Sequence, residues 1–510
     1  MELRDREARE PHEKASEKSV SLSLCCSLSP DRDSVTHPVK TILTLSLAFF
    51  SLALFAPPGA QAGELKAGVG VTEITPPVGY RMCGYFYERL STGVHDPLYA
   101  KAIYLQQAQE QAALVFCDLI GVPQSVTEKT RVIAGGKTGI PATNILIAAT
   151  HSHTGPLYFD ALRTFLHERA VAQNGRDQQE TVDYPSVLSE KLAGVIAAAK
   201  NAARPVELEA GVAKQTGLSF NRRYHMKDGT VVFNPGKMNP NIVRPAGPID
   251  PEVGIVLFRD AKSRQPSSSL TVFALHLDTM GGTEYGADYP FYLERSLREK
   301  FGGNFISVFG AGTCGDINHI DVSTNRLQKG GEETLRIGNT LAETVLQARR
   351  GLEPAGKPSL GVRYAKVFAP LQEFSEEQIA QARERVPLIG TKGLSFLDQV
   401  QAYKVLDAQE MRARSGPMLP MEVEVFRLDN DTAIVGLPGE VFVELGLAIK
   451  QASPFRNTLV IELCNNDISY VPTKKAFSEG SYEVVNSRVQ SGGGERLVEA
   501  AVKLLNELKQ

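Results

Sequence analysis

Apolar positions along the chain alternate between short continuous runs and segments with a spacing of three and four. Continuous apolar runs of this length are typical of buried strands. They occur at Ala112–Cys117, Asn144–Ala149, Leu270–Leu277, Phe305–Phe309, Thr432–Leu437 and Thr458–Leu463. Helical spacing occurs at Ser189–Ala203, Phe291–Lys300, Glu332–Arg349, Glu376–Arg385 and Glu495–Leu508. The alternation predicts an α/β fold, with helices layered around a central mixed sheet.

The first 62 residues have a different pattern and lie outside this predicted fold. Residues 1–37 are polar and charged, and Lys40 is followed by the apolar run Thr41–Phe55 and by Ala60-Gln61-Ala62. A basic residue, a short apolar core and a small-x-small site make up a secretory signal peptide. The run is shorter than the about 20 apolar residues of a membrane span, although an N-terminal anchor stays an alternative. We expect a non-structural extension at 1–37, a signal peptide at 38–62 that is cleaved near Ala62, and a single secreted or periplasmic catalytic domain at 63–510.

Composition limits the classes of function. The 510 residues include 55 Lys and Arg against 58 Asp and Glu, a net charge of −3. A balanced charge argues against nucleic acid as the main partner. Four cysteines lie beyond residue 62, too few for a disulfide framework, although one or two bridges stay open. They are Cys83, Cys117, Cys314 and Cys464.

Several apolar runs end in polar residues with reactive side chains. In α/β sheets, ligands collect outside the carboxyl ends of the strands, so these ends predict one convergent site. The alternative is that each residue caps a helix or closes a turn. The residues are Asp118, His151, His153, His276, Asp278, Asp316, Glu440, Asn465, Asn466 and Asp467.

A His-x-His pair follows the run that ends at Ala149. Residues two apart in an extended strand point to the same side, so His151 and His153 can face one metal ion. Imidazole suits zinc, and a catalytic zinc site keeps a position open for water. The alternative is a pair of structural hydrogen-bonding residues.

Six ordered motifs over most of the chain resemble those of the neutral (non-lysosomal) ceramidase family. They are Gly68–Pro77, Gly93–Ile103, Ala149–Pro156, Phe309–Asp316, Leu437–Glu440 and Ser469–Thr473. Six motifs in order are more specific than any one alone. The resemblance implies a zinc-dependent hydrolase of amide bonds, with a small-molecule or lipid-like N-acyl substrate.

The resemblance also implies roles for individual residues. In that family one Zn²⁺ is held by two histidines, a glutamate and a tyrosine. Matched by motif, these are His95, one of His151 and His153, Glu440 and Tyr470, for one zinc per chain. Tyr482 matches a second family tyrosine that steadies the substrate carbonyl, as a phenol donor can.

The chain departs from the family pattern in two places. Family members have a serine two residues after the Gly-Asp pair, whereas Gly315-Asp316 is followed by Ile317 and Asn318. An amide side chain cannot lose a proton and attack, so we expect zinc-activated water as the nucleophile. Family members also carry a C-terminal immunoglobulin-like domain, and we expect none here because the last predicted helix ends the sequence.

Other groups near these motifs are candidates for proton transfer. A general base must lie within about 2.6–3.2 Å of its proton, and the free ring of the His151/His153 pair, Asp316 and His319 are candidates. Asn318 is a candidate oxyanion donor or reader of the substrate amide. Cys314 is a rival nucleophile, with small-residue packing as the alternative.

Three functions stay open from the sequence. The first is the secreted zinc-dependent amide hydrolase, which is favoured because every implied ligand is present. The second is a metal-dependent hydrolase of an ester or phosphoester, for which Asp118, Asp278 and Asp316 offer carboxylates. The third is a catalytically silent binding protein with the same fold. The oligomeric state and peripheral membrane contact stay open.

Overall fold

The computed structural model describes residues 63–354, 357–389 and 393–510, so the predicted extension and signal peptide lie outside the described residues. Its largest sheet has the order β14-β12-β11-β6-β1-β3-β4-β5, with β16 against β6. The pairs β4–β5 and β12–β14 are parallel and the rest antiparallel, so the predicted mixed α/β fold is confirmed. The strands are β1 (Lys66–Glu73), β3 (Tyr99–Gln107), β4 (Glu110–Cys117), β5 (Ile145–Ala149), β6 (Arg204–Lys214), β11 (Glu252–Asp260), β12 (Pro266–Phe273), β14 (Ile306–Ala311) and β16 (Glu353–Pro354).

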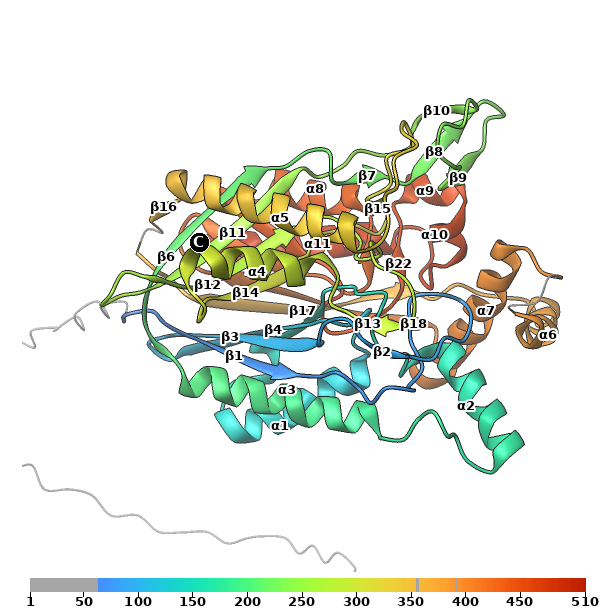
Figure 1. Cartoon of the computed structure of the whole chain (residues 1–510), viewed down its shortest axis with the longest axis horizontal. Helices are drawn as coiled ribbons and strands as arrows, with labels where there is room; N and C mark the ends of the chain where they lie inside the picture. Colours follow the sequence, from blue (N-terminus) through green and yellow to red (C-terminus); the bar gives the residue numbers. More distant parts are fainter. Residues whose placement is uncertain (1–62, 355–356, 390–392) are drawn as a thin grey trace, which may run out of the picture. The chain divides into compact units, whose positions relative to one another are not determined.

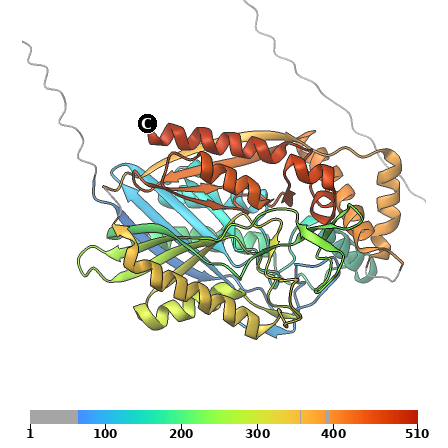
Figure 2. The ribbon, with the colours of Figure 1, turned by 90° about the horizontal axis from the view of Figure 1, so that it is seen from above.

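A second, smaller sheet packs face to face on the first (Figure 2). Its order is β17-β18-β19-β21, with β19 and β21 parallel. Leu114 and Phe116 of the large sheet share a core with Ile434 and Ile461 of the small one. The strands are β17 (Gly361–Pro370), β18 (Met418–Arg427), β19 (Thr432–Gly436) and β21 (Asn457–Ile461).

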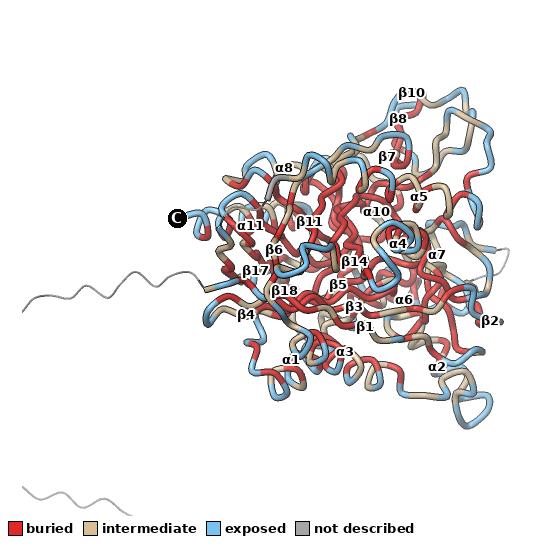
Figure 3. The backbone as a smooth tube through the Cα atoms, turned by 60° about the vertical axis from the view of Figure 1, so that its left-hand side comes forward, coloured by how far each residue is buried: buried red, intermediate tan, exposed pale blue. Residues whose placement is uncertain are grey.

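Helices cover the outer faces of both sheets (Figures 1 and 3). One half of the large sheet packs against α1 (Gln124–Thr138) and α3 (Tyr184–Asn201), and the other half against α4 (Tyr289–Phe301) and α5 (Gly331–Ala348). The small sheet packs against α8 (Val443–Ala452) and α11 (Gly493–Lys509). None of the helices in the described ranges is long and apolar enough to cross a membrane.

The continuous apolar run of β4 follows from burial on both sides of the sheet. Leu114 and Phe116 face the core between the two sheets, whereas Val115 and Cys117 face α1 and α3. Alternate residues of a strand point to opposite faces, so a strand with two covered faces reads as unbroken apolar sequence. The four cysteines at 83, 117, 314 and 464 are buried and free.

Short elements gather at the end of the molecule where β5, β19 and β21 finish (Figure 1). The helices are α2 (Asp160–Asn174), α6 (Glu376–Arg385), α7 (Phe396–Ser415), α9 (Lys474–Glu479) and α10 (Tyr482–Val485), with a 3₁₀ turn at Val386–Leu388. Two other 3₁₀ turns, Ala142–Asn144 and Arg349–Gly351, directly precede β5 and follow α5. The strands are β2 (Gly93–Val94), β7 (Phe220–Asn221), β8 (Arg223–Met226), β9 (Val231–Phe233), β10 (Ile242–Pro245), β13 (Glu284–Tyr285), β15 (Ile317–Asn318), β20 (Glu440–Val441) and β22 (Tyr470–Val471).

A buried carboxylate in the first turn of α5 makes stability depend on pH. Glu333 accepts hydrogen bonds from Arg326 at 2.5 Å and Arg336 at 2.7 Å. Burial disfavours the carboxylate, but the two guanidinium groups outweigh it and lower the pKa of Glu333 to about 2. A carboxyl group whose pKa is lowered in the folded state stabilises the protein at pH values above its ordinary pKa. This stabilisation is lost as the pH falls toward 2.

We expect Glu333→Gln to lower the free energy of unfolding at pH 7 by about 1–2 kcal/mol. The full pKa shift corresponds to about 3 kcal/mol, and solvent screening of the two surface arginines reduces it. Urea unfolding of both proteins between pH 7 and pH 3 measures the difference, which should shrink as pH falls below about 4.5. A difference that stays constant with pH would contradict this origin.

Candidate metal centre and catalytic cavity

Three histidines from separate segments point their Nε2 atoms at one another. His151 and His153 follow β5, and His276 follows β12. Nε2 of His151 lies 3.0 Å from Nε2 of His276 and 3.3 Å from Nε2 of His153. His151 and His276 are buried, and His153 is partly buried in a cavity wall. The three Nε2 atoms lie close enough together for a metal ion to bind among them.

The second nitrogen of each ring fixes the tautomer. Each Nδ1 lies within hydrogen-bonding distance of a backbone carbonyl, which can only accept. Nδ1 therefore carries the proton of the neutral ring, and the Nε2 lone pair faces the other two rings. Three lone pairs at this separation repel one another unless a cation or a proton lies between them. The acceptors for His151, His153 and His276 are Ile120 at 2.9 Å, Gly84 at 3.1 Å and Cys314 at 3.0 Å.

A carboxylate completes this centre. Oε2 of Glu440 lies 3.3 Å from Nε2 of His151 and 3.3 Å from Nε2 of His276. The same oxygen is buried and accepts no hydrogen bond from the described residues. Two imidazole nitrogens and one carboxylate oxygen are donors that zinc prefers, and a bound cation would give this oxygen a partner. The residues present therefore fit a zinc ion.

The pKa values of these groups show where a proton sits without a metal. Although burial favours the neutral acid, His151 and His276 hold the pKa of Glu440 well below its ordinary value. Burial also disfavours imidazolium, but Glu440 raises the pKa of His151 to about 9. Burial lowers the pKa of His153 to about 4, and burial together with Arg222 holds the pKa of His276 well below its ordinary value. Two rings are thus neutral at pH 7, the form that binds metals.

Tyr470 faces the same centre from the neighbouring strand. β20 and β22 are parallel, and Glu440 lies directly opposite Tyr470. Opposite residues of neighbouring strands point to the same side of a sheet. The strands approach closely because Gly439 has φ of 73° and a Cβ there would lie 2.5 Å from the carbonyl oxygen of Ser469. Burial and Glu440 raise the pKa of Tyr470 well above its ordinary value, which only a nearby cation would reverse.

Tyr482 presents a hydroxyl group that is free to donate. Its oxygen lies 3.5 Å from the hydroxyl of Tyr470 and accepts a hydrogen bond from Nδ2 of Asn486 at 3.3 Å. Because Asn486 occupies the acceptor side, the hydroxyl proton can point toward Tyr470 or a ligand. Burial and Glu440 raise the pKa of Tyr482 to about 12, so the group stays protonated at neutral pH.

Arg222 brings a buried positive charge to the two tyrosines. Its guanidinium carbon lies 5.4 Å from the ring centroid of Tyr470 and 5.9 Å from that of Tyr482. Nε donates to Glu483 at 2.9 Å and Nη2 donates to the carbonyl of Gly315 at 2.7 Å, which fixes the side chain. A fixed cation beside phenol donors favours negative charge that develops in the cavity.

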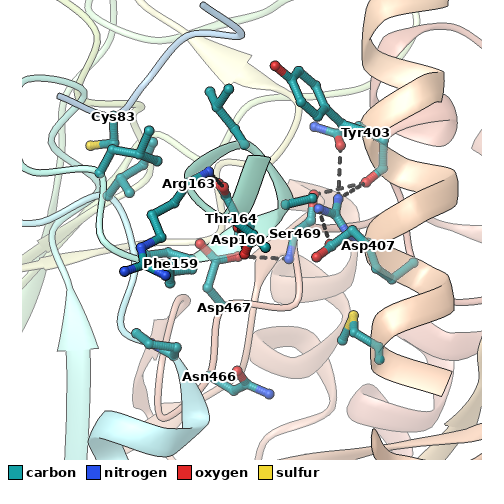
Figure 4. A pocket seen from close by; sticks show the side chains of 18 of the residues that line it. Cys83, Phe159, Asp160, Arg163, Thr164, Tyr403, Asp407, Asn466, Asp467 and Ser469 are labelled. Atoms are coloured by element: carbon teal, nitrogen blue, oxygen red, sulfur yellow. Dashed lines mark hydrogen bonds and ion pairs between the residues drawn. The ribbon is translucent and has the colours of Figure 1, made fainter. Parts of the chain in front are cut away.

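The centre opens into a cavity of about 570 Å³. His151, His153, Glu440, Tyr470 and Tyr482 all line it. Its walls also carry apolar side chains, among them Leu157, Phe159, Leu162, Tyr403, Met411 and Leu419. A polar region faces the same space and includes Asp160, Asp407, Asn466, Asp467 and Ser469 (Figure 4), together with Arg488. The cavity can therefore hold a ligand with both an apolar and a polar part.

The structure does not bring His95 to this centre. The His95 side chain is 33% exposed, its Nδ1 lies 3.0 Å from Oδ1 of Asp96, and it does not line the cavity. His95 follows the short strand β2, which pairs with β13 rather than with the central sheet. His276 stands beside His151 and Glu440, where the motif match had placed His95.

The three residues of the Gly-Asp loop have structural contacts instead of a place in the cavity wall. Oδ2 of Asp316 accepts from Asn221 at 2.7 Å, and Oδ1 accepts from the backbone N–H of Val443 at 2.9 Å. Nδ2 of Asn318 donates to Asn234 at 2.9 Å, and Nε2 of His319 lies 2.6 Å from the carbonyl oxygen of Gln328. Neither the proton-transfer roles of Asp316 and His319 nor the oxyanion role of Asn318 gains support from these contacts.

The carboxylates considered for a phosphoester hydrolase lie apart from one another, and Cys314 is not activated as a nucleophile. Oδ2 of Asp118 accepts from the N–H of Tyr99, whereas Asp278 binds Tyr85 and Asp316 binds its own partners, so these carboxylates share no bonded cluster. Burial and Glu462 raise the pKa of the Cys314 thiol well above its ordinary value. A buried, protonated thiol is a poor nucleophile.

A second group of possible ligands is an ion-pair network. Nδ1 of His167 lies 3.0 Å from Asp177 and 3.1 Å from Glu180. Arg81 contacts Asp177 at 2.5 Å, and Arg163 binds Glu180. Because the two arginines already neutralise both carboxylates, this group has little electrostatic attraction for a cation.

Two residues of the centre were missed as functional residues in the sequence, although both carried a signal. His276 was among the polar strand ends but was not assigned as a ligand. Arg222 lies in the polar run Asn221-Arg222-Arg223-Tyr224. Its burial is evident only from the structure.

Comparisons with known proteins agree with the motif resemblance. No protein-family model matches the chain. The neutral ceramidase of Pseudomonas aeruginosa is 24% identical over 86% of this chain and 71% of its own length. The crystal structure of that organism's neutral ceramidase matches 88% of this chain and 74% of its own with a TM-score of 0.65 and 18% identity. A ceramidase complexed with C2 matches 88% of this chain and 75% of its own with a TM-score of 0.64 and 17% identity. The chain is therefore a relative of the neutral ceramidases and has their fold.

Proposed function

We propose that this protein is an exported, zinc-dependent hydrolase of N-acyl amide bonds. The observation that carries the proposal is the convergence of the Nε2 atoms of His151 and His276 with Oε2 of Glu440 at a cavity wall. The relationship to a neutral ceramidase supports amide bonds over other bonds as the target.

His151, His276, Glu440 and Tyr470 would hold the zinc ion. When bound, zinc supplies a Lewis acid that polarises a carbonyl oxygen and lowers the pKa of a water molecule toward 7. The Nδ1 hydrogen bonds of His151 and His276 orient both rings for this task. The position of Tyr470 opposite Glu440 supports its assignment as the fourth ligand.

Two further side chains that line the cavity would act on the substrate itself, and Arg222, which does not line it, would act at longer range. His153 is neutral and lines the cavity, with its Nε2 3.3 Å from that of His151, so it would take a proton from the attacking water and pass it to the leaving amine. Tyr482 would donate its hydroxyl proton to the oxygen of the amide carbonyl, and Arg222 would favour the developing charge. Water is the proposed nucleophile because the family serine is replaced by Asn318.

The lining of the cavity supports a substrate with two unlike parts. An apolar acyl chain would pack on Leu157, Leu162 and Met411, and a polar head group would face Asp467 and Arg488. Burial and Glu440 raise the pKa of Asp467 to about 6, which places this carboxyl within the field of the centre. We therefore propose small or lipid-like N-acyl compounds with a polar amine portion as substrates.

The purified protein should contain about one zinc ion per chain. A panel of N-acyl amines with short and long acyl chains should be cleaved, and chelation should remove the activity, with recovery on adding zinc. Ester and phosphoester substrates serve as the comparison panel. Bound zinc with turnover of phosphoesters alone would contradict the amide proposal, and a chain that binds no divalent metal would contradict the zinc proposal.

Export is proposed on the signal-peptide pattern of residues 38–62. Expression of the full chain in a Gram-negative host should yield a mature protein in the periplasm or medium, with an N-terminus near residue 63 in its intact mass. An unprocessed cytoplasmic chain would contradict this proposal without affecting the proposed chemistry.

A further inference from the structure

We infer that Glu462 is a positioning residue that holds two metal-binding side chains, Glu440 and His276, in place. The inference rests on the proposed function, because it concerns affinity for the metal. Glu462 follows β21 and is 0% exposed. It does not line the cavity, so it can act only through its neighbours.

Both carboxylate oxygens of Glu462 accept hydrogen bonds. Oε2 accepts from the backbone N–H of Val441 at 2.8 Å and from that of Cys314 at 3.0 Å. Oε1 accepts from Sγ of Cys314 at 3.0 Å. A buried acidic side chain is costly unless its oxygens have hydrogen-bond partners, and here three donors supply them. One oxygen thus joins two chain segments that are far apart in sequence.

Each of these two segments leads directly to a metal-binding side chain. Val441 follows Glu440, so the hydrogen bond to its N–H fixes the peptide group that carries the Glu440 side chain. The carbonyl of Cys314 accepts from Nδ1 of His276 at 3.0 Å, so the hydrogen bond to the N–H of Cys314 fixes the acceptor that orients this ring.

The two segments also contact each other. The N–H of Gly315 donates to the carbonyl of Val441 at 2.9 Å, and a Cβ at Gly315 would lie 2.4 Å from the carbonyl oxygen of Glu440. Because the two segments lie this close together, the single oxygen Oε2 of Glu462 can accept from the N–H groups of both. Loss of that oxygen would leave two buried N–H groups without their acceptor, and the segments could relieve this only by moving apart.

Glu462 is also conspicuous in the sequence. Val460-Ile461-Glu462-Leu463 is a buried apolar run with one carboxylate in it. Mutation of a side chain that orients a metal ligand typically lowers metal affinity by about 10–100-fold. A comparable effect is expected here, although Glu462 acts through two backbone segments rather than on a ring nitrogen directly.

The test compares Glu462→Gln with Glu462→Leu. Glutamine keeps an oxygen that can accept from both N–H groups, and its NH₂ group can face Sγ of Cys314, whereas leucine has no acceptor. We expect Glu462→Leu to lower zinc affinity about 10–100-fold and Glu462→Gln to bind zinc as tightly as the wild type. Competition with a chromophoric chelator measures the affinity, and the visible absorption of bound cobalt(II) reports the ligand geometry.

Glu424→Gln is the matched control. Glu424 is also 0% exposed in a strand of the small sheet, but it pairs with Arg131 and has no contact with the metal-binding residues. Its loss should lower thermal stability and leave zinc affinity unchanged. If Glu462→Leu does not fold, Glu462→Asp replaces it, because the shorter carboxylate is drawn away from the two N–H groups.

The outcomes separate the inference from the proposed function. Wild-type affinity in Glu462→Leu or Glu462→Asp overturns the inference and leaves the zinc hydrolase standing. A glutamine variant that loses as much affinity as the leucine variant also overturns it, because the acceptor oxygen would then not be the decisive group. A wild-type chain that binds no divalent metal overturns the proposed function and the inference together.

Discussion

Replacement of His276 by alanine is expected to abolish both zinc binding and amide hydrolysis, whereas replacement of His95 leaves both intact. His276 places Nε2 3.0 Å from that of His151 and 3.3 Å from Oε2 of Glu440. Loss of a residue that only orients a metal ligand lowers metal affinity by up to about 100-fold. Loss of the ligand itself should lower zinc affinity by more than that. Zinc content after dialysis and the rate of N-acyl amine cleavage measure the effect.

His95→Ala is the matched control for this experiment. It removes the same imidazole from a partly exposed position beside Asp96, and His95 belongs to neither group of three possible metal ligands among the described residues. A His95→Ala protein that loses zinc, with a His276→Ala protein that keeps it, would favour the ligand set implied by the family motifs. Loss of zinc in both would point to a rearrangement of the loop after β2 that brings His95 to the metal.

The fold was predictable wherever a strand is buried on both faces. The runs at Ala112–Cys117 and Thr432–Leu437 correspond to β4 and β19 because no polar residue interrupts them. β6 and β17 were missed, since they have one open face and alternate between buried and more exposed positions without a continuous apolar run. α7 was also missed, because its buried residues do not follow a clear helical stripe.

The metal centre was predictable as a set of strand ends but not as a ligand list. The predicted strand Leu270–Leu277 included His276, whereas β12 ends at Phe273. The chain leaves the sheet there, and this turns His276 toward His151 and Glu440. Which side chains meet after a strand ends depends on the path of the following loop, and apolar periodicity carries no information about that path.

Other site residues depend on contacts between distant segments. Tyr470 and Tyr482 were found through the motif resemblance alone, because a tyrosine in a buried run otherwise indicates packing. The contact of Asn318 with Asn234 could not be predicted, since it depends on how two loops of different elements pack. Sequence spacing constrains neighbours along one strand or helix and leaves such pairs undetermined.

Tyr482→Phe should lower kcat by about 10²–10³-fold while zinc content stays at the wild-type level. The substitution removes only the hydroxyl group, which lies 3.5 Å from that of Tyr470 and accepts from Asn486. Because the pKa of Tyr482 is raised to about 12, the wild-type group is a neutral donor throughout the working pH range. Removal of a preorganised hydrogen-bond donor to a developing oxyanion lowers kcat by about 10²–10³-fold.

The division of this effect between kcat and KM decides the role of the hydroxyl. A donor that strengthens its hydrogen bond as charge develops lowers kcat and kcat/KM together, whereas a donor that only binds substrate raises KM. Tyr364→Phe is the control, because that hydroxyl binds Glu422 on β18 away from the cavity, and its loss should leave both constants unchanged. If Tyr482→Phe instead strips zinc at an unchanged melting temperature, the hydroxyl acts on the metal centre through Tyr470, and its proposed role as the oxyanion donor is contradicted.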